Sequence, residues 1–144
     1  TQVKTAIPYF IRFTKKLKTL KSLSKSSEKQ ILKLWEGLGY YRRARNLLAS
    51  AKLLVKDHNS KLPNTIEEVK KLPGVGDYTA NALLGLIYDQ PTIALDGNVK
   101  RVFARNLNKK EEKIDYENFN PYDYFVMPKG SSYDVFKLGE NGQH

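Results

Sequence analysis

Cysteine is missing from all 144 residues of this chain. The chain therefore cannot form a disulfide, present a thiolate nucleophile, or bind zinc or an iron–sulfur cluster through cysteine. Histidine is scarce too, and His58 and His144 lie too far apart in sequence to suggest a shared metal ion. No hydrophobic run approaches the roughly 18 residues of a membrane span, and no segment resembles a secretory signal. We therefore expect a soluble intracellular protein that binds neither a metal nor a membrane.

Acidic residues are scarce in the first three quarters of the chain. Residues 1–108 contain 20 lysines and arginines but only 8 aspartates and glutamates, whereas residues 109–144 contain 5 against 7. A surface with this excess of positive charge attracts polyanions, and nucleic acid is the first candidate. A basic surface that is merely well solvated gives the same counts, so charge alone leaves both interpretations open.

The two-residue alternation of exposed strands is absent, and hydrophobic residues up to about position 107 follow helical spacing. Ile31, Leu34 and Trp35 are typical of this pattern, because they fall on one side of a helix. We expect a connection at residues 18–27 and helices over about 3–17, 27–37, 41–58, 65–72, 77–88 and 97–107. Thr65 and Glu68 fit a capping box at the start of the fourth helix. The expected fold class is all-α.

The character of the sequence changes at about residue 108. Aromatic residues are then interspersed with prolines, glycines and serines, and helical periodicity is weak. We therefore expect one helical domain over residues 1–107 and an aromatic-rich tail over residues 108–144. The tail either packs on the domain as irregular structure or does not belong to it.

The most specific local signal is the turn at residues 72–76, between two short helices. Its two glycines, Gly74 and Gly76, flank Val75 and permit crowded or left-handed backbone at both positions. Such a turn lets backbone N–H groups at a helix N-terminus approach an anion, and a DNA phosphate fits because the helix dipole also favours it. The contact positions the protein without reading sequence. The plainer interpretation is a glycine-rich link between two core helices.

Three stretches, residues 35–47, 72–80 and 94–102, resemble in order and spacing the helix-hairpin-helix base-excision DNA glycosylases of the endonuclease III superfamily. The resemblance implies a helix-hairpin-helix glycosylase domain over residues 1–107, with the hairpin at about 65–88. The endonuclease III-like branch has a nucleophilic lysine where this chain has Tyr78, which cannot form an imine. Tyr78, residues 96–99 and residues 37–41 are similar to the A/G-specific adenine glycosylase family instead.

That resemblance implies base-excision repair by a monofunctional enzyme, which hydrolyses the N-glycosidic bond of A mispaired with G or 8-oxoguanine. Its implied catalytic residues are Asp96, Tyr78 and Asn98. A carboxylate such as Asp96 stabilises the positive charge that develops on the sugar. The structural alternatives are a helix N-cap for Asp96, a first-turn residue for Asn98 and a core tyrosine for Tyr78.

The resemblance also implies a second group of DNA-binding residues, beside Gly74, Val75 and Gly76 of the hairpin. The loop Leu38-Gly39-Tyr40 would wedge into the duplex while the adenine is flipped out, with Thr1 and Gln2 nearby on the side that senses 8-oxoguanine. The alternative is that the tyrosines of this loop cap the core. The implied partner is double-stranded DNA that contains A:G or A:8-oxoguanine pairs.

The chain also departs from the family. The family's general acid is a glutamate upstream of a Thr-Gln-Val-Lys stretch, and this chain begins with that stretch at Thr1. Most members carry a 4Fe-4S cluster, whose cysteine ligands are absent here, and a domain that recognises 8-oxoguanine. We therefore expect a fragment that binds DNA weakly and excises adenine poorly, since losing a positioned general acid costs about 10²–10⁴-fold.

Other functions remain open at this point. A non-catalytic helix-hairpin-helix module would bind DNA without releasing a base, an endonuclease III-like lyase would form a covalent adduct, and a small basic protein could bind RNA. We expect a monomer of marginal stability, cytoplasmic and nucleoid-associated in a bacterium, or nuclear or mitochondrial in a eukaryote.

Overall fold

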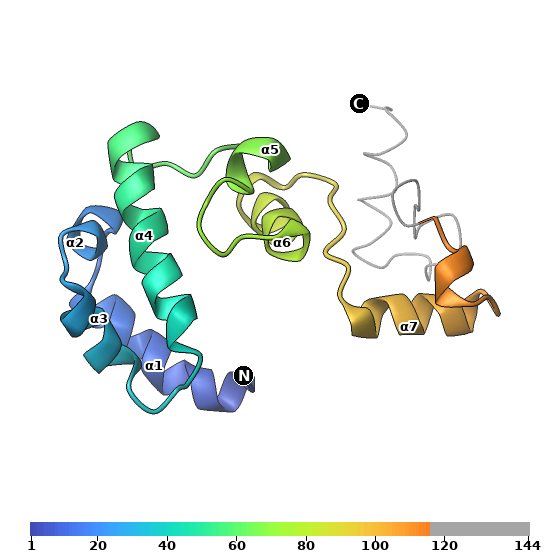
Figure 1. Ribbon diagram of the computed structural model, residues 1–144, viewed down its shortest axis with the longest axis horizontal. Helices are drawn as coiled ribbons and strands as arrows, with labels where there is room; N and C mark the ends of the chain where they lie inside the picture. The colour runs from blue at the N-terminus through green and yellow to red at the C-terminus, as the bar shows by residue number, and fades with distance from the viewer. Residues whose placement is uncertain (116–144) are drawn as a thin grey trace, which may run out of the picture. The chain divides into compact units, whose positions relative to one another are not determined.

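The computed structural model describes residues 1–115 of the chain, and their regular structure is entirely helical (Figure 1). The helices are α1 (Val3–Lys16), α2 (Leu20–Ser24), α3 (Glu28–Trp35), α4 (Tyr41–Asp57), α5 (Ile66–Val69), α6 (Asp77–Tyr88), α7 (Gly97–Asn106) and the 3-10 turn η1 (Glu111–Lys113). The expected all-α class is confirmed. None of these helices is long and apolar enough to cross a membrane.

The chain divides into two compact units, of which the first is Thr1–Gln90 and the second begins at Pro91. The first unit contains α1 to α6, and the second contains α7 and η1. The boundary expected near residue 107 therefore falls inside the second unit, just after α7. The expected tail begins with η1, and its part beyond residue 115 lies outside the described residues.

Polar side chains set several helix starts. The Ser27 hydroxyl accepts a hydrogen bond from the N–H of Gln30 at 3.2 Å, and the Gln30 side chain accepts one from the N–H of Ser27 at 2.9 Å. A similar box of Thr19 and Ser22 starts α2, inside the stretch that we expected to be a connection. That expectation was wrong because the Lys/Ser-rich composition masks the apolar contacts of a helix of only five residues.

The capping box expected at the start of α5 does not form. Thr65 is the N-cap, but its side chain makes no capping hydrogen bond. Glu68 instead pairs with Lys71, three residues further along the chain. The Glu68 carboxylate is therefore engaged by a lysine one helical turn away and not by the Thr65 backbone.

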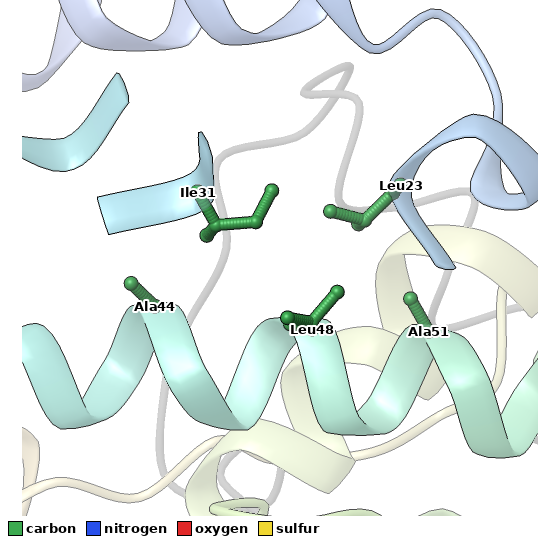
Figure 2. Packing of buried hydrophobic residues seen from close by; sticks show 5 residues of the cluster. All are labelled: Leu23, Ile31, Ala44, Leu48 and Ala51. Atoms are coloured by element: carbon green, nitrogen blue, oxygen red, sulfur yellow. The ribbon is translucent and has the colours of Figure 1, made fainter. Parts of the chain in front are cut away.

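The core of the first unit lies along α4. Figure 2 shows Leu23 of α2 and Ile31 of α3 facing Ala44, Leu48 and Ala51 of α4, and all five are buried. Small residues at 44 and 51 let α2 and α3 approach α4 closely, while the larger side chains fill the space between. Burying a leucine or isoleucine stabilises the fold by about 1.5–3 kcal/mol.

A smaller apolar cluster joins α5 to α6. Val69, Ala80 and Leu84 are at most 1% exposed, and half-buried Val75 packs against them. The hairpin is therefore held together by its own core, with α5 and α6 on either side of the turn.

Some apolar residues of these helices are exposed. Ile87 of α6 is 55% exposed and Val102 of α7 is 53% exposed, whereas Ala104 is the buried residue of α7. The spacing predicted every α-helix except α2, but not which apolar side chains are buried within the described residues.

Candidate nucleic-acid interface

The hairpin turn is a tight crossing between α5 and α6. Leu72 is 4% exposed and anchors the turn, and the Val75 N–H donates to the Leu72 carbonyl at 3.1 Å. Gly74 between them has a φ of +76°, in the left-handed region that favours glycine. Because the Val75 amide is occupied and its side chain is packed, Val75 anchors the turn rather than presenting its own N–H.

The N-terminus of α6 is open to solvent. Gly76 is its N-cap and provides no capping side chain, and a Cβ built on Gly76 would meet nothing within 4 Å. The first intrahelical bond runs from the Ala80 N–H to the Gly76 carbonyl at 2.9 Å. The N–H groups of residues 77–79 therefore have no intrahelical acceptor, and they lie at the positive end of the helix dipole. This arrangement suits a phosphate oxygen.

Asp77, in the first turn of α6, faces a cation. Its Oδ1 lies 2.5 Å from Lys70 Nζ, and both side chains are well exposed. The Asp77 carbonyl accepts from the Asn81 side chain at 2.9 Å. Lys70 therefore offsets the negative charge that Asp77 places beside the exposed amides.

A second exposed feature is the loop between α3 and α4. Trp35 Nε1 donates to the Gly39 carbonyl at 2.9 Å, and the Gly37 N–H donates to the Tyr41 hydroxyl at 3.3 Å. Gly37 has a φ of +88°, which favours glycine, and a Cβ there would lie 2.7 Å from the Tyr9 hydroxyl. These contacts hold the loop in one shape.

Tyr40 stands out from this loop. It has a φ of 52° and is 75% exposed, and the Arg43 guanidinium lies over its ring, 5.6 Å from the ring centroid. A solvent-exposed aromatic ring held in left-handed backbone is energetically unusual and suits a residue that contacts a partner. Leu38 is half-buried, so only Tyr40 of the two expected wedge residues is exposed.

Several of the expected DNA-binding residues line two hollows of the first unit. A groove of about 530 Å³ runs from Tyr40, along α4, to Gly74 and Val75 of the hairpin. A pocket of about 410 Å³ brings Thr1 and Leu38 together with Trp35. Gln2 is exposed and is the N-cap of α1. The structure thus brings Tyr40 and the hairpin to one groove, and Thr1 and Leu38 to another pocket.

Of the three expected catalytic residues, Tyr78 belongs to the first unit and the other two to the second. Tyr78 is in the first turn of α6 and is 50% exposed, so it is not a core tyrosine. Asp96 is the N-cap of α7, and its Oδ1 accepts from the Val99 N–H at 2.7 Å. The Asn98 side chain accepts a hydrogen bond from Arg101. Asp96 therefore acts as the N-cap of α7. The cap uses one carboxylate oxygen, so the position of Asp96 is also compatible with a catalytic role.

One ionisable group near the hairpin has a shifted pKa. The hydrogen bond from Lys71 lowers the pKa of the Glu68 carboxyl below its usual value, and the charges of Lys71 and His58 act in the same direction. Within residues 1–115 no three His, Asp or Glu side chains gather as a metal site. The chain also has no cysteine for a cluster, so the residues present do not fit one.

Residues 1–120 match the family model described as HhH-GPD superfamily base excision DNA repair protein. The chain belongs to this family. The matched range includes the hairpin, the Tyr40 loop and Asp96, so every site residue expected in this chain lies inside it.

Similar curated proteins carry one name. The chain is 46% identical over 114 residues to the adenine DNA glycosylase of Buchnera aphidicola subsp. Baizongia pistaciae, and the match covers 76% of this chain and 32% of that protein. The adenine DNA glycosylase of Rattus norvegicus is 43% identical over 106 residues, covering 73% of this chain and 20% of that protein. The chain therefore spans a third or less of the length of these relatives.

Solved structures agree on the HhH-GPD fold. An endonuclease III from a trapped covalent complex with DNA matches with a TM-score of 0.68 and 23% identity, over 81% of this chain and 59% of that one. A thermostable thymine-DNA glycosylase matches with a TM-score of 0.71 and 22% identity, over 92% and 64%.

Sequence reasoning missed some residues that support these features. Arg43 lies three positions after Tyr40, a spacing that predicts contact at a helix start. Arg101 follows Asn98 by the same three positions. Lys70, which pairs with Asp77 seven positions away, carried no comparable signal, because one cation among many in a basic sequence does not stand out.

Proposed function

We propose that the protein to which this chain belongs is an adenine DNA glycosylase, which removes A mispaired with G or 8-oxoguanine. The observation that carries the proposal is the 46% identity to a curated adenine DNA glycosylase across 76% of the chain. The open N-terminus of α6, beside a glycine turn on a basic unit, supports a DNA partner.

Glycosidic hydrolysis needs a negative charge beside the sugar. As the bond from C1′ to the adenine nitrogen breaks, its electron pair leaves with the base, which takes up a proton, and positive charge develops on the sugar. Water then adds to C1′ and loses a proton. In this proposal the Asp96 carboxylate stabilises that cation, with Asn98 and Tyr78 ordering the sugar. Arg101 orients the Asn98 amide through its hydrogen bond.

The DNA-binding residues share the remaining work in this proposal. The exposed amides at Gly76 and residues 77–79 bind a backbone phosphate, and Tyr40 fills the space in the stack when the adenine is extruded. Leu38, Gly39, Thr1 and Gln2 contact the opposite strand near 8-oxoguanine. Extruding a base costs a few kcal/mol, and an inserted aromatic ring offsets part of that cost.

The test is single-turnover release of adenine from a duplex with one A opposite 8-oxoguanine, measured with the full-length protein and with this chain in parallel. The expected result is release that is lost in Asp96→Asn. A normal A:T duplex is the control for the mispair. Release of adenine at the same rate from both duplexes would contradict the proposed substrate.

A borohydride trap separates this proposal from lyase chemistry. A lyase that uses an amine nucleophile forms an imine with the sugar, and reduction makes the adduct permanent. Tyr78 is a phenol, so a tyrosine at this position supports hydrolysis without such an adduct. An adduct whose amount depends on residue 78 would overturn this assignment.

A further inference from the structure

Two successive turns of α4 face two successive residues of the hairpin turn. The Ser50 hydroxyl donates to the Pro73 carbonyl at 3.3 Å, and Ser50 is only 9% exposed. Asn46, one helical turn earlier, lies against Gly74. A Cβ built on Gly74 would be 2.3 Å from Asn46 Nδ2 and 2.9 Å from its Cγ. The turn therefore rests on two polar side chains of one helix.

The contact at Gly74 requires the absence of a side chain as well as its backbone conformation. Gly74 has a φ of +76°, which costs other residues about 1–2 kcal/mol. Its Cβ position is filled by the whole end of the Asn46 side chain, including atoms close to the backbone of α4. Any larger residue would push α4 and the turn apart.

The same helix carries the exposed Tyr40. Tyr40 is the N-cap of α4, and Arg43 of α4 lies over its ring. Asn46 follows Tyr40 by six residues, which corresponds to about 9 Å along a helix at 1.5 Å per residue. A rigid element thus joins the residue proposed to enter the duplex to the turn proposed to hold its backbone.

We propose that Asn46 and Ser50 are positioning residues that fix the hairpin turn relative to Tyr40. Through them, the exposed amides and the aromatic ring act on one stretch of duplex at a fixed spacing. This inference rests on the proposed DNA-binding function. Such spacing matters because a misplacement of about 1 Å can cost as much as about 100-fold in a step that depends on geometry.

Both residues are uncharged, and this gives the proposal a distinctive signature. Loss of a cation that contacts a phosphate reduces the salt dependence of DNA binding by about 0.9 in log–log slope. Loss of Asn46 or Ser50 displaces backbone N–H groups and removes no cation. Affinity should therefore fall while the salt slope stays the same.

The experiment uses the full chain and a fluorescein-labelled 20-base-pair duplex without a mispair, read by anisotropy across a salt series. The variants are Asn46→Ala, Ser50→Ala and Gly74→Ala, with Ala49→Ser at an exposed position of α4 as the control. We expect Asn46→Ala and Ser50→Ala to weaken binding about tenfold at unchanged salt slope, with both variants still folded at the assay temperature. Amide hydrogen exchange should accelerate at the Val75 N–H in both variants.

A compensating pair of changes tests the contact directly. Gly74→Ala should weaken binding because its methyl group collides with Asn46. The double variant Gly74→Ala with Asn46→Ala should bind the duplex at least threefold more tightly than Gly74→Ala alone. A residue that stabilises the fold only in a general way would give no such rescue. The double variant also guards against a single variant that fails to fold.

The possible failures are distinguishable. If the unchanged chain does not bind the duplex, the proposed DNA-binding function fails and this inference with it. If it binds but Asn46→Ala and Ser50→Ala bind equally well, or if the double variant shows no rescue, only the positioning role is overturned.

Discussion

Lys70 and Asp77 face each other across the hairpin turn, with Lys70 Nζ 2.5 Å from Asp77 Oδ1. Asp77 is the acidic residue of the first turn of α6, whose N–H groups we propose to bind a phosphate. The pair is exposed, so it contributes little to stability. Its main effect is electrostatic, because Lys70 is already paired with Asp77 at the place where we propose that a phosphate binds.

Replacing Asp77 with asparagine should therefore strengthen DNA binding. The change removes a repulsive charge and frees Lys70 for a phosphate, so the salt slope should steepen by up to about 0.9. The helix should lose about 0.3–1 kcal/mol, because a negative charge at its N-terminus is favourable. Duplex affinity at several salt concentrations measures the first effect, and urea unfolding measures the second.

The matched control for this prediction is Asp89→Asn at the other end of α6. It makes the same change in charge at the C-cap, in a left-handed conformation that asparagine tolerates. Equal gains in affinity for both variants would mean that only net charge matters, and that the hairpin end of α6 has no special role.

Asp96 should separate into a capping role and a chemical role. Asparagine is as good an N-cap as aspartate, so Asp96→Asn should keep the stability of α7 while lowering adenine release by about 10²-fold or more. Asp96→Ala should lose release equally and also about 1 kcal/mol of stability. Single-turnover release and thermal unfolding of both variants measure this difference. Retained release in Asp96→Asn would remove the carboxylate from the mechanism.

Tyr40 should act through its ring. Tyr40→Ala should lose distortion of the duplex, seen as a smaller rise in the fluorescence of 2-aminopurine placed at the mispair, whereas Tyr40→Phe should keep it. Aromatic stacking on a base is worth about 1–3 kcal/mol. The neighbouring Tyr41 provides the control, since Tyr41→Phe loses the hydrogen bond with the Gly37 N–H but leaves the exposed ring in place. Equal signals from Tyr40→Ala and the unchanged chain would rule out the wedge.

The helices could be predicted from sequence because their signals are local. Ser27 caps α3, and the break between α5 and α6 falls at Gly74, whose left-handed backbone and close approach to Asn46 favour glycine. The start of α5 could not be predicted in detail, since the outcome depended on whether Glu68 preferred an amide or Lys71. Short-range competition of this kind has no signature in the spacing of residue types.

The candidate site shows the same division. Gly74 and Asp96 could be identified because a left-handed turn and a helix cap restrict the residue type at these two positions. Asn46 and Ser50 could not, because their importance comes from a contact with residues more than twenty positions away. Within α4 they look like ordinary polar residues on an amphipathic helix.

The pair of Glu68 and Lys71 gives a pH-dependent prediction. The hydrogen bond from Lys71 holds the pKa of the Glu68 carboxyl below its usual value. The stabilisation is therefore present above the unfolded pKa and is lost as the pH falls through the folded pKa. Lys71→Met should raise the pKa of Glu68 in an NMR titration and reduce the loss of stability on acidification. Lys33→Met is the control, and an equal rise in both variants would show that general charge, not the hydrogen bond, sets the pKa.

The core along α4 should be sensitive to truncation in a way that the surface is not. Leu48 of α4 packs with Leu23 of α2 and Ile31 of α3 and is 5% exposed, whereas Leu86 of α6 is 85% exposed. Leu48→Ala should cost about 2–5 kcal/mol because it leaves a cavity in a small core, and Leu86→Ala should cost almost nothing. Because single domains have only about 5–15 kcal/mol of stability, the Leu48 variant should unfold at a much lower urea concentration. Since both variants delete the same atoms, equal midpoints would mean that α2, α3 and α4 do not form the core described here.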